Sequence, residues 1–175
     1  MRSITDFILV PSGGKMYTDN SSNGEFDFVL SSGIESHKNT NRIAEVVSIP
    51  MNYSGDIQPG DEVVVHHNVF RKYNDMRGKE KFSSGLLHDG MYSAEMVEVF
   101  AYRRNGSEWT SISPYIFTTP ERTSFGTVSI TNKEHESKGI KAGIKFFYDA
   151  ISEYEFMIEG VKMYRVNIRN LCATE

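Results

Sequence analysis

The stretch Ile57-Gln58-Pro59-Gly60-Asp61-Glu62-Val63-Val64-Val65 decides the fold, because a glycine-centred turn runs directly into an apolar, β-branched strand. A counterpart lies further along the chain, with Gly143 as the turn glycine: Ile140-Lys141-Ala142-Gly143-Ile144-Lys145-Phe146-Phe147-Tyr148. Recurrence of a turn and strand at a fixed place indicates an internal repeat, and a repeat decides the fold more strongly than any single strand.

Two further blocks recur in the same order around these stretches. Ala44-Glu45-Val46 precedes the first stretch and Gly126-Thr127-Val128 precedes the second. Downstream, residues 89–92 lead into 96–101 in the first copy, and residues 159–164 lead into 168–173 in the second. Short β patterns also coincide by chance, but three blocks in one order favour a tandem duplication.

The apolar residues form short β-branched or aromatic runs bounded by Gly, Pro, Asn and Asp, and none keeps helical spacing for three turns. We therefore predict an all-β chain with strands at 6–10, 43–49, 62–67, 95–102, 115–118, 127–130, 145–148, 154–158 and 162–166. Asn105-Gly106 predicts a tight hairpin turn between the copies, since both residues tolerate positive φ. We expect two domains, 1–106 and 107–175, joined rigidly by that turn.

Charge and hydropathy exclude several classes of partner. The chain has 19 Lys and Arg against 23 Asp and Glu, for a net charge of −4, which argues against a nucleic-acid partner. No apolar run approaches the roughly 20 residues that span a bilayer, so we expect no membrane and a cytoplasmic location. Cys172 is the single cysteine and sits among apolar neighbours, so we expect a buried, reduced thiol.

With these blocks the chain resembles the GroES-type co-chaperonins, whose subunit is a small irregular β-barrel with a long mobile loop after its first strand. Residues 6–10, 42–47 and 57–65 carry the resemblance in the first copy; residues 125–128, 140–143, 154–160 and 164–173 carry it in the second. The resemblance implies two tandem GroES-like β-barrels. The first, 1–106, holds the mobile loop at about 11–41 and an insertion at about 71–87; the second, 107–175, lacks the loop.

The resemblance also implies a function without chemistry: a co-chaperonin-like lid that binds a GroEL-type chaperonin and assists protein folding as a homo-oligomer, in the host cytoplasm if the chain is viral. Phe28-Val29-Leu30 stands where the family's docking tripeptide lies, inside a loop rich in Ser, Asn and Gly, and Ile34 follows it. From the residues alone, this triplet either binds a partner or packs on its own barrel. The alternative function is a viral structural or assembly protein built on the same barrel pair.

Other candidate sites are weaker. His66 and His67 are adjacent, so in a strand they point to opposite faces and cannot chelate one ion together; His88 could approach either, but no metal site is expected. Residues 71–82 mix basic and aromatic side chains as single-strand binders do, yet acidic residues interrupt them and Gly78 breaks a strand, so we prefer a solvated, flexible insertion. No phosphate loop, nucleophile elbow or Cys/His pair is present in the sequence, so we expect neither an enzyme nor a cofactor.

Overall fold

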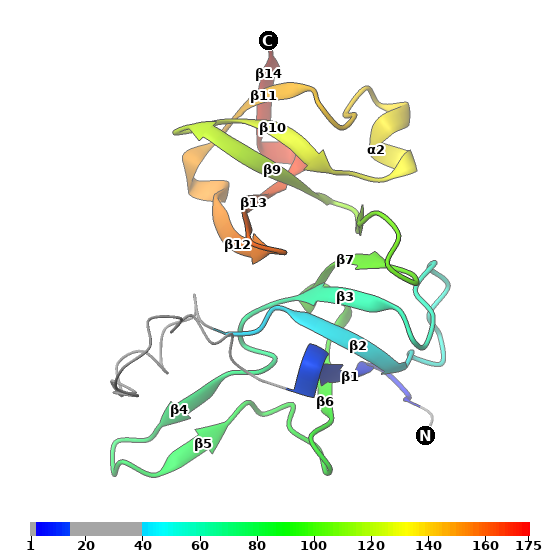
Figure 1. Ribbon diagram of the computed structural model, residues 1–175, viewed down its shortest axis with the longest axis vertical. Coiled ribbons are helices and arrows are strands. Elements are labelled where there is room, and N and C mark those ends of the chain that lie inside the picture. The colour runs from blue at the N-terminus through cyan, green and yellow to red at the C-terminus, as the bar shows by residue number, and fades with distance from the viewer. Residues whose placement is uncertain (1–2, 15–39) are drawn as a thin grey trace. The chain divides into compact units, whose positions relative to one another are not determined.

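The computed structural model describes residues 3–14 and 40–175, drawn in colour in Figure 1. These residues are nearly all β, which confirms the predicted fold class. The chain divides into two compact units, Met1–Val99 and Phe100–Glu175. Within the described ranges, no helix is long and apolar enough to cross a membrane.

Unit 1 is built on strands β1 (Phe7–Pro11), β2 (Ile43–Ser48), β3 (Glu62–Val65) and β6 (Tyr92–Ala94), with β7 (Val99–Arg103) beginning at its last residue. Their order in the sheet is β6-β1-β2-β3-β7, and β8 (Thr110–Ser111) follows β7. A separate two-stranded sheet contains β4 (Lys72–Asn74) and β5 (Glu80–Phe82). The described part of this unit also contains two 3-10 turns, η1 (Ser12–Gly14) and η2 (Met96–Glu98).

Unit 2 has a six-stranded sheet of order β12-β13-β9-β10-β11-β14. Its strands are β9 (Tyr115–Arg122), β10 (Phe125–Ile130), β11 (Lys145–Tyr148), β12 (Tyr154–Ile158), β13 (Val161–Asn167) and β14 (Leu171–Thr174). The helix α2 (Lys133–Ser137) connects β10 to β11, while η3 (Ala150–Ser152) and η4 (Ile168–Asn170) precede β12 and β14. All five neighbouring pairs of strands in this sheet are antiparallel.

The predicted hairpin at Asn105-Gly106 is present. Both residues have positive φ, 50° and 71°, and β7 pairs antiparallel with β8 on either side of them. The boundary between the compact units nevertheless falls inside β7, upstream of this turn.

The strand order β6-β1-β2-β3-β7 of unit 1 is repeated in unit 2 as β13-β9-β10-β11-β14. The registers agree as well: Ala44 pairs with Val63 and Pro11, and Gly126 pairs with Phe146 and Pro120. The pairing of β1 with β2 and that of β9 with β10 also shift register at equivalent positions. In unit 1 the shift lies between Ile8 and Leu9. In unit 2 it lies between the residues of β10 that pair with Phe117 and Thr118. The blocks compared in the sequence therefore occupy equivalent positions, while the closure of each sheet into a barrel stays a prediction.

The same backbone hydrogen bonds surround the two turn glycines. Gly60 N donates to Val46 O (2.7 Å), and Val46 N donates to Asp61 O (2.9 Å). In unit 2, Gly143 N donates to Val128 O and Val128 N donates to Ile144 O, both at 2.9 Å. The glycines have φ of 89° and 84°, a region that residues with a Cβ rarely adopt.

The units differ in their connections. Residues 12–42 join β1 to β2 in unit 1, whereas only Thr123-Ser124 join β9 to β10 in unit 2, with Ser124 at φ 59°. The β4–β5 hairpin lies between β3 and β6, where unit 2 has η3 and β12 instead.

The expectation that Gly78 breaks any strand within residues 71–82 is wrong. Lys72 pairs with Phe82 and Asn74 with Glu80, so two strands form on either side of Gly78. Gly78 lies in the turn at φ 73°, and Asp75 Oδ1 accepts hydrogen bonds from the amides of Arg77 and Lys79, each at 2.9 Å. The glycine therefore permits the turn of a hairpin.

The predicted strand 95–102 is also wrong in its first half, where η2 forms. Glu95 and Glu98 make a capping box, in which each side chain accepts from the other's backbone amide, including Glu95 N to Glu98 Oε2 at 3.0 Å. This local pairing competes with strand hydrogen bonds, so β7 begins only at Val99.

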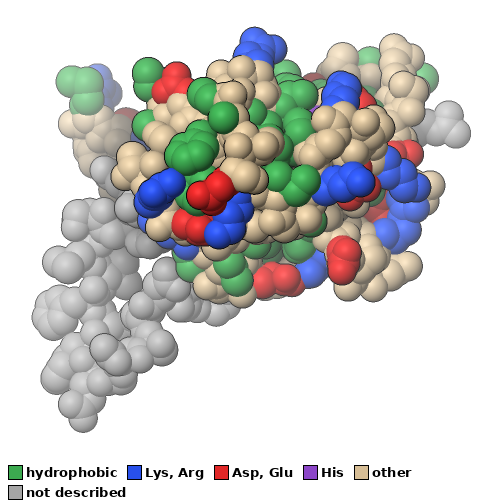
Figure 2. All heavy atoms as spheres, turned by 90° about the horizontal axis from the view of Figure 1, so that it is seen from above, with side chains coloured by type: hydrophobic (Ala, Val, Ile, Leu, Met, Phe, Trp, Pro, Cys, Tyr) green, Lys and Arg blue, Asp and Glu red, His purple; other side chains and the backbone are tan. Residues whose placement is uncertain are grey.

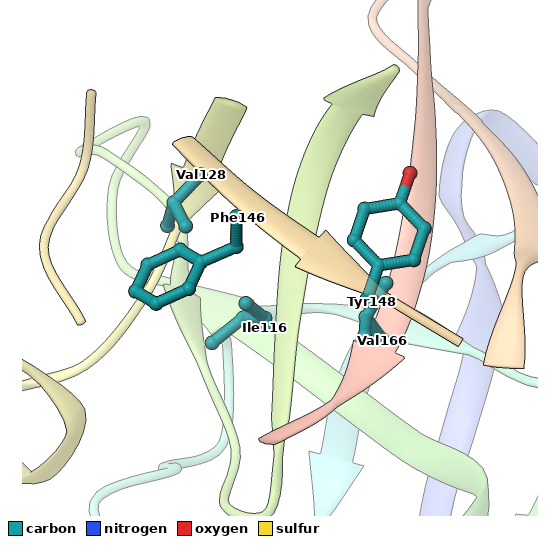
Figure 3. Close-up of a cluster of buried hydrophobic side chains, with 5 residues drawn as sticks. All are labelled: Ile116, Val128, Phe146, Tyr148 and Val166. Atoms are coloured by element: carbon teal, nitrogen blue, oxygen red, sulfur yellow. The ribbon is translucent and has the colours of Figure 1, made fainter. Parts of the chain in front are cut away.

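Each unit has its own apolar core. In unit 1, Phe7, Leu9 and Phe70 are completely buried, and Phe70 meets Tyr92 edge to face with ring centroids 4.9 Å apart. Figure 3 shows the central cluster of unit 2, in which side chains from four strands converge: Ile116, Val128, Phe146, Tyr148 and Val166. A second aromatic group in unit 2 surrounds Arg165, whose guanidinium carbon lies 4.3 Å from the ring centroid of Phe100 and 4.4 Å from that of Tyr115.

The equivalence of Gly126 and Ala44 gives a test of the packing in unit 2. A Cβ on Gly126 would lie 2.7 Å from Thr119 O and 3.3 Å from Pro120 Cα, both backbone atoms of β9. Gly126→Ala should therefore lower the free energy of unfolding of unit 2 by about 1–3 kcal/mol. Hydrogen exchange at the amides of Val128 and Tyr148, which are hydrogen-bonded within unit 2, measures it over a series of urea concentrations and gives a midpoint.

The control is Ala44→Gly in unit 1, which removes a Cβ at the matched position and should leave the protection of Val128 and Tyr148 unchanged. An unchanged or raised midpoint for Gly126→Ala would contradict the close approach of β9 and β10.

Candidate functional site

The predicted partner-binding residues Phe28, Val29, Leu30 and Ile34 lie outside the described residues, but the two ends of the segment that carries them are described. β1 and β2 pair antiparallel up to Pro11 and Ala44, so the chain leaves and re-enters the sheet at neighbouring positions. Thr40, Asn41 and Arg42 are buried at the return. The described residues on either side of this segment, 12–14 and 40–42, therefore adjoin the paired ends of β1 and β2.

Asn41 connects these two ends directly. Its Nδ2 donates to Ser12 O (3.0 Å), and its Oδ1 accepts from Ile43 N (3.0 Å). A single amide side chain thus donates to a carbonyl of the outgoing segment and accepts from an amide of the incoming strand, which a carboxylate, having no donor, could not do. Sequence analysis did not single out Asn41, since its role depends on Ser12, far away in the chain.

A pocket of about 600 Å³ lies in unit 1 beside the β4–β5 hairpin. Most of its lining side chains are polar. They come from the β4–β5 hairpin and the residues on either side of it, from the residue before β1, from β6 and from the start and end of η2: Asp6, Asn68, Arg71, Tyr73, Ser83, Ser84, Leu87, Ser93, Glu95 and Glu98. Asp6 Oδ2 accepts from Ser93 Oγ (2.6 Å), which joins β1 to β6 at the pocket. The volume is in the range of ligand sites, but the lining is polar where such sites are usually apolar.

Glu98 lines this pocket, and the pKa of its carboxyl is raised above the ordinary value. Burial raises the pKa of its carboxyl, and repulsion from Glu95 and Asp6 adds to the rise, whereas the hydrogen bond from Glu95 N opposes it. Partial burial together with neighbouring carboxylates therefore favours the protonated form. The Glu95-x-x-Glu98 spacing was visible in the sequence, but the approach of Asp6 was not.

The expectation for the adjacent histidines needs correction. β3 ends at Val65, so His66 and His67 do not alternate across a strand, and their ring centroids lie 4.2 Å apart. His88 instead contacts Asp89, with Nδ1 and Oδ2 3.0 Å apart, at an exposed site. Among residues 3–14 and 40–175, no group of three or more His, Cys, Asp or Glu side chains could hold a metal ion.

A serine and a histidine meet in unit 2. His135 is completely buried, its Nε2 lies 3.3 Å from Ser113 Oγ, and burial lowers the pKa of its imidazole. Its Nδ1 has no hydrogen-bond partner among the described residues. A nucleophilic serine needs a histidine that is oriented by a third group through its other nitrogen, so this pair lacks the arrangement of a catalytic triad.

The single cysteine lies at the surface, and so do many charged side chains. Cys172 is exposed, so the expectation of a buried thiol is wrong: β14 is the edge strand of its sheet, and the Cys172 side chain faces outward. Figure 2 shows Lys and Arg side chains interspersed with Asp and Glu on one face, without a broad area of either sign.

No family model matches the chain, and no curated protein matches it.

Asn41→Asp tests the connection between the ends of the segment. Aspartate keeps the acceptor for Ile43 N but places an oxygen against Ser12 O, so the free energy of unfolding of unit 1 should fall by about 1–3 kcal/mol. Hydrogen exchange at the amides of Ile43 and Val46 measures the loss. Asn167→Asp is the matched control, because the hydrogen bond of Asn167 uses only Oδ1, from Arg169 N (3.1 Å). Equal protection in both variants would contradict the role assigned to Asn41.

Glu98→Gln tests the electrostatics of the pocket. Because the pKa of Glu98 is raised in the folded protein, its contribution to stability is lost as pH rises from the unfolded pKa through the folded one. Glutamine is neutral and can still accept from Glu95 N, so the thermal midpoint at pH 7 should rise, and the difference should vanish below about pH 4. Glu98→Ala removes the acceptor as well and should not stabilise. A lower midpoint for Glu98→Gln at pH 7 would show that the charged form is favoured.

Proposed function

We propose that this chain is a non-enzymatic binding protein of the co-chaperonin type, which acts as a lid on a GroEL-type chaperonin. The tripeptide Phe28-Val29-Leu30, with Ile34 nearby, docks into an apolar groove of the chaperonin. Several copies of the chain assemble and present several such segments together. The protein contributes binding and closure of a cavity, and performs no reaction.

One observation supports this proposal most: the long connection 12–42 leaves unit 1 between two paired strands, and Asn41 holds its ends together. The repeated sheet of unit 2 places only Thr123-Ser124 at the equivalent position. The extra chain length is therefore not needed to connect the strands. Connections much longer than the geometry requires usually carry function.

The energetics of such a lid depend on several segments acting together. A segment that orders on binding loses conformational entropy, so each contact is weak by itself. Linking several segments in one oligomer turns later contacts into intramolecular events and raises the overall affinity without any new contact. An oligomer is thus part of the proposed mechanism.

Replacing Phe28, Val29 and Leu30 together by Ser tests the proposal. Each side chain contributes about 1.5–3 kcal/mol when buried in a partner groove, before ordering costs, so each contact should weaken by orders of magnitude. The thermal midpoint of the free protein should change little, since a docking triplet is not part of its core. The measurements are the thermal midpoint and ATP-dependent co-sedimentation with a GroEL-type chaperonin.

Ile151→Ser is the control, because Ile151 is an apolar residue that is 94% exposed outside this segment, and it should leave co-sedimentation intact. A large fall in midpoint for the triple variant would mean that the triplet packs on its own unit. Unchanged co-sedimentation, or none for the parent protein, would favour a viral structural or assembly protein instead.

A further inference from the structure

The β4–β5 hairpin has a charge opposite to that of the rest of the chain. Between residues 71 and 82 the sequence has five cations, Arg71, Lys72, Arg77, Lys79 and Lys81, and two acids, Asp75 and Glu80. The hairpin therefore carries a formal charge of +3, and the remainder of the chain carries −7. The net charge of −4, from which we expected no nucleic-acid partner, conceals this separation.

The hairpin also exposes two aromatic rings that belong to no core. Tyr73 is 39% exposed and Phe82 is 37% exposed. β4 and β5 join neither six-stranded sheet, and Figure 1 shows them side by side, apart from β1, β2 and β3 of the same unit. Burial in unit 1 does not account for these rings.

Each ring lies beside a cation. The Lys72 ammonium is 5.8 Å from the centroid of Phe82, its partner across the two strands, and the guanidinium carbon of Arg71 is 5.4 Å from the centroid of Tyr73. Lys81 is the cross-strand partner of Tyr73. Because paired residues share a face of the ribbon, both faces combine an aromatic ring with a positive charge.

We propose that this hairpin, residues 71–82, is an arm that binds single-stranded nucleic acid. Unpaired bases stack on exposed aromatic rings, and the adjacent phosphates are neutralised by Lys and Arg, which is how proteins bind single strands without reading their sequence. An acidic peptide would use the cations but would leave the exposed ring of Phe82 without a role. The paired rings and cations therefore favour the nucleic acid.

The carboxylates near the hairpin limit where the strand lies. Asp6, Glu95 and Glu98 line the pocket beside Arg71 and Tyr73, and they repel phosphates from its interior. Asp75 Oδ1 is engaged by two amides of the turn. The contact is thus assigned to Phe82 and Lys72 and to the exposed cations beyond them, Arg77, Lys79 and Lys81.

Fluorescence anisotropy of the full chain with a labelled 12-nucleotide oligo-dT and oligo-U tests the proposal. Binding should be measurable at 50 mM salt, and its affinity should fall with salt with a log–log slope of about −0.7 for each phosphate contact. The triple variant Lys72→Gln, Lys79→Gln, Lys81→Gln should lose at least tenfold in affinity and have a shallower slope. Phe82→Ala should weaken binding about tenfold with the slope unchanged, because stacking releases no counter-ions.

The control triple variant is Lys133→Gln, Lys138→Gln, Lys141→Gln in unit 2, which changes the net charge equally and should retain binding. Circular dichroism checks that all variants are folded. The proposal is overturned if the parent chain does not bind at 50 mM salt, or if both triple variants lose affinity equally. It is also overturned if poly-glutamate competes as well as oligo-dT and Phe82→Ala has no effect, which would assign the arm to an acidic protein.

Discussion

The structure depends on a reciprocal pair of backbone hydrogen bonds next to a turn glycine. In unit 1 these bonds join Val46 to Gly60 and Asp61, and in unit 2 they join Val128 to Gly143 and Ile144. They fix the register between the second and third strands of each repeat, and a slip of one residue would turn every core side chain outward. Both turns need a residue with positive φ, and glycine adopts this conformation readily, so the two turn positions can be recognised in the sequence by their glycines.

For this reason the sequence predicted the β class, most strand positions and the hairpin at Asn105-Gly106. The predictions that were wrong concern residues whose neighbours in space outweigh a local pattern. The capping box of Glu95 and Glu98 replaced a predicted strand with a 3-10 turn. Gly78 permitted a hairpin turn where a strand break was expected, and the edge position of β14 exposed Cys172.

The candidate sites divide in the same way. The apolar triplet 28–30 could be found in the sequence because it stands out within a polar segment, and its role remains a prediction. The role of Asn41 could not be found in the sequence, because it depends on hydrogen bonds to Ser12 and Ile43 at once, and Ser12 is distant in the chain. The pocket likewise combines Asp6 with Glu98 and the hairpin, which only the folded chain brings together. The basic and aromatic residues of 71–82 were visible in the sequence, but their pairing across two strands was not.

The unequal connections between equivalent strands also bear on how the chain folds. Pro11 and Ala44 pair across 33 residues, whereas Pro120 and Gly126 pair across six. Closing the longer loop costs more chain entropy before any strand contact compensates for it, so the sheet of unit 2 has the more local nucleus. During synthesis the N-terminal unit emerges first but has the slower pairing to complete. We therefore expect the side of β2 that pairs with β1 to stay unpaired, and open to incorrect partners, for longer than the equivalent side of β10 in unit 2. The unit that is synthesised first is then the one expected to complete its sheet last.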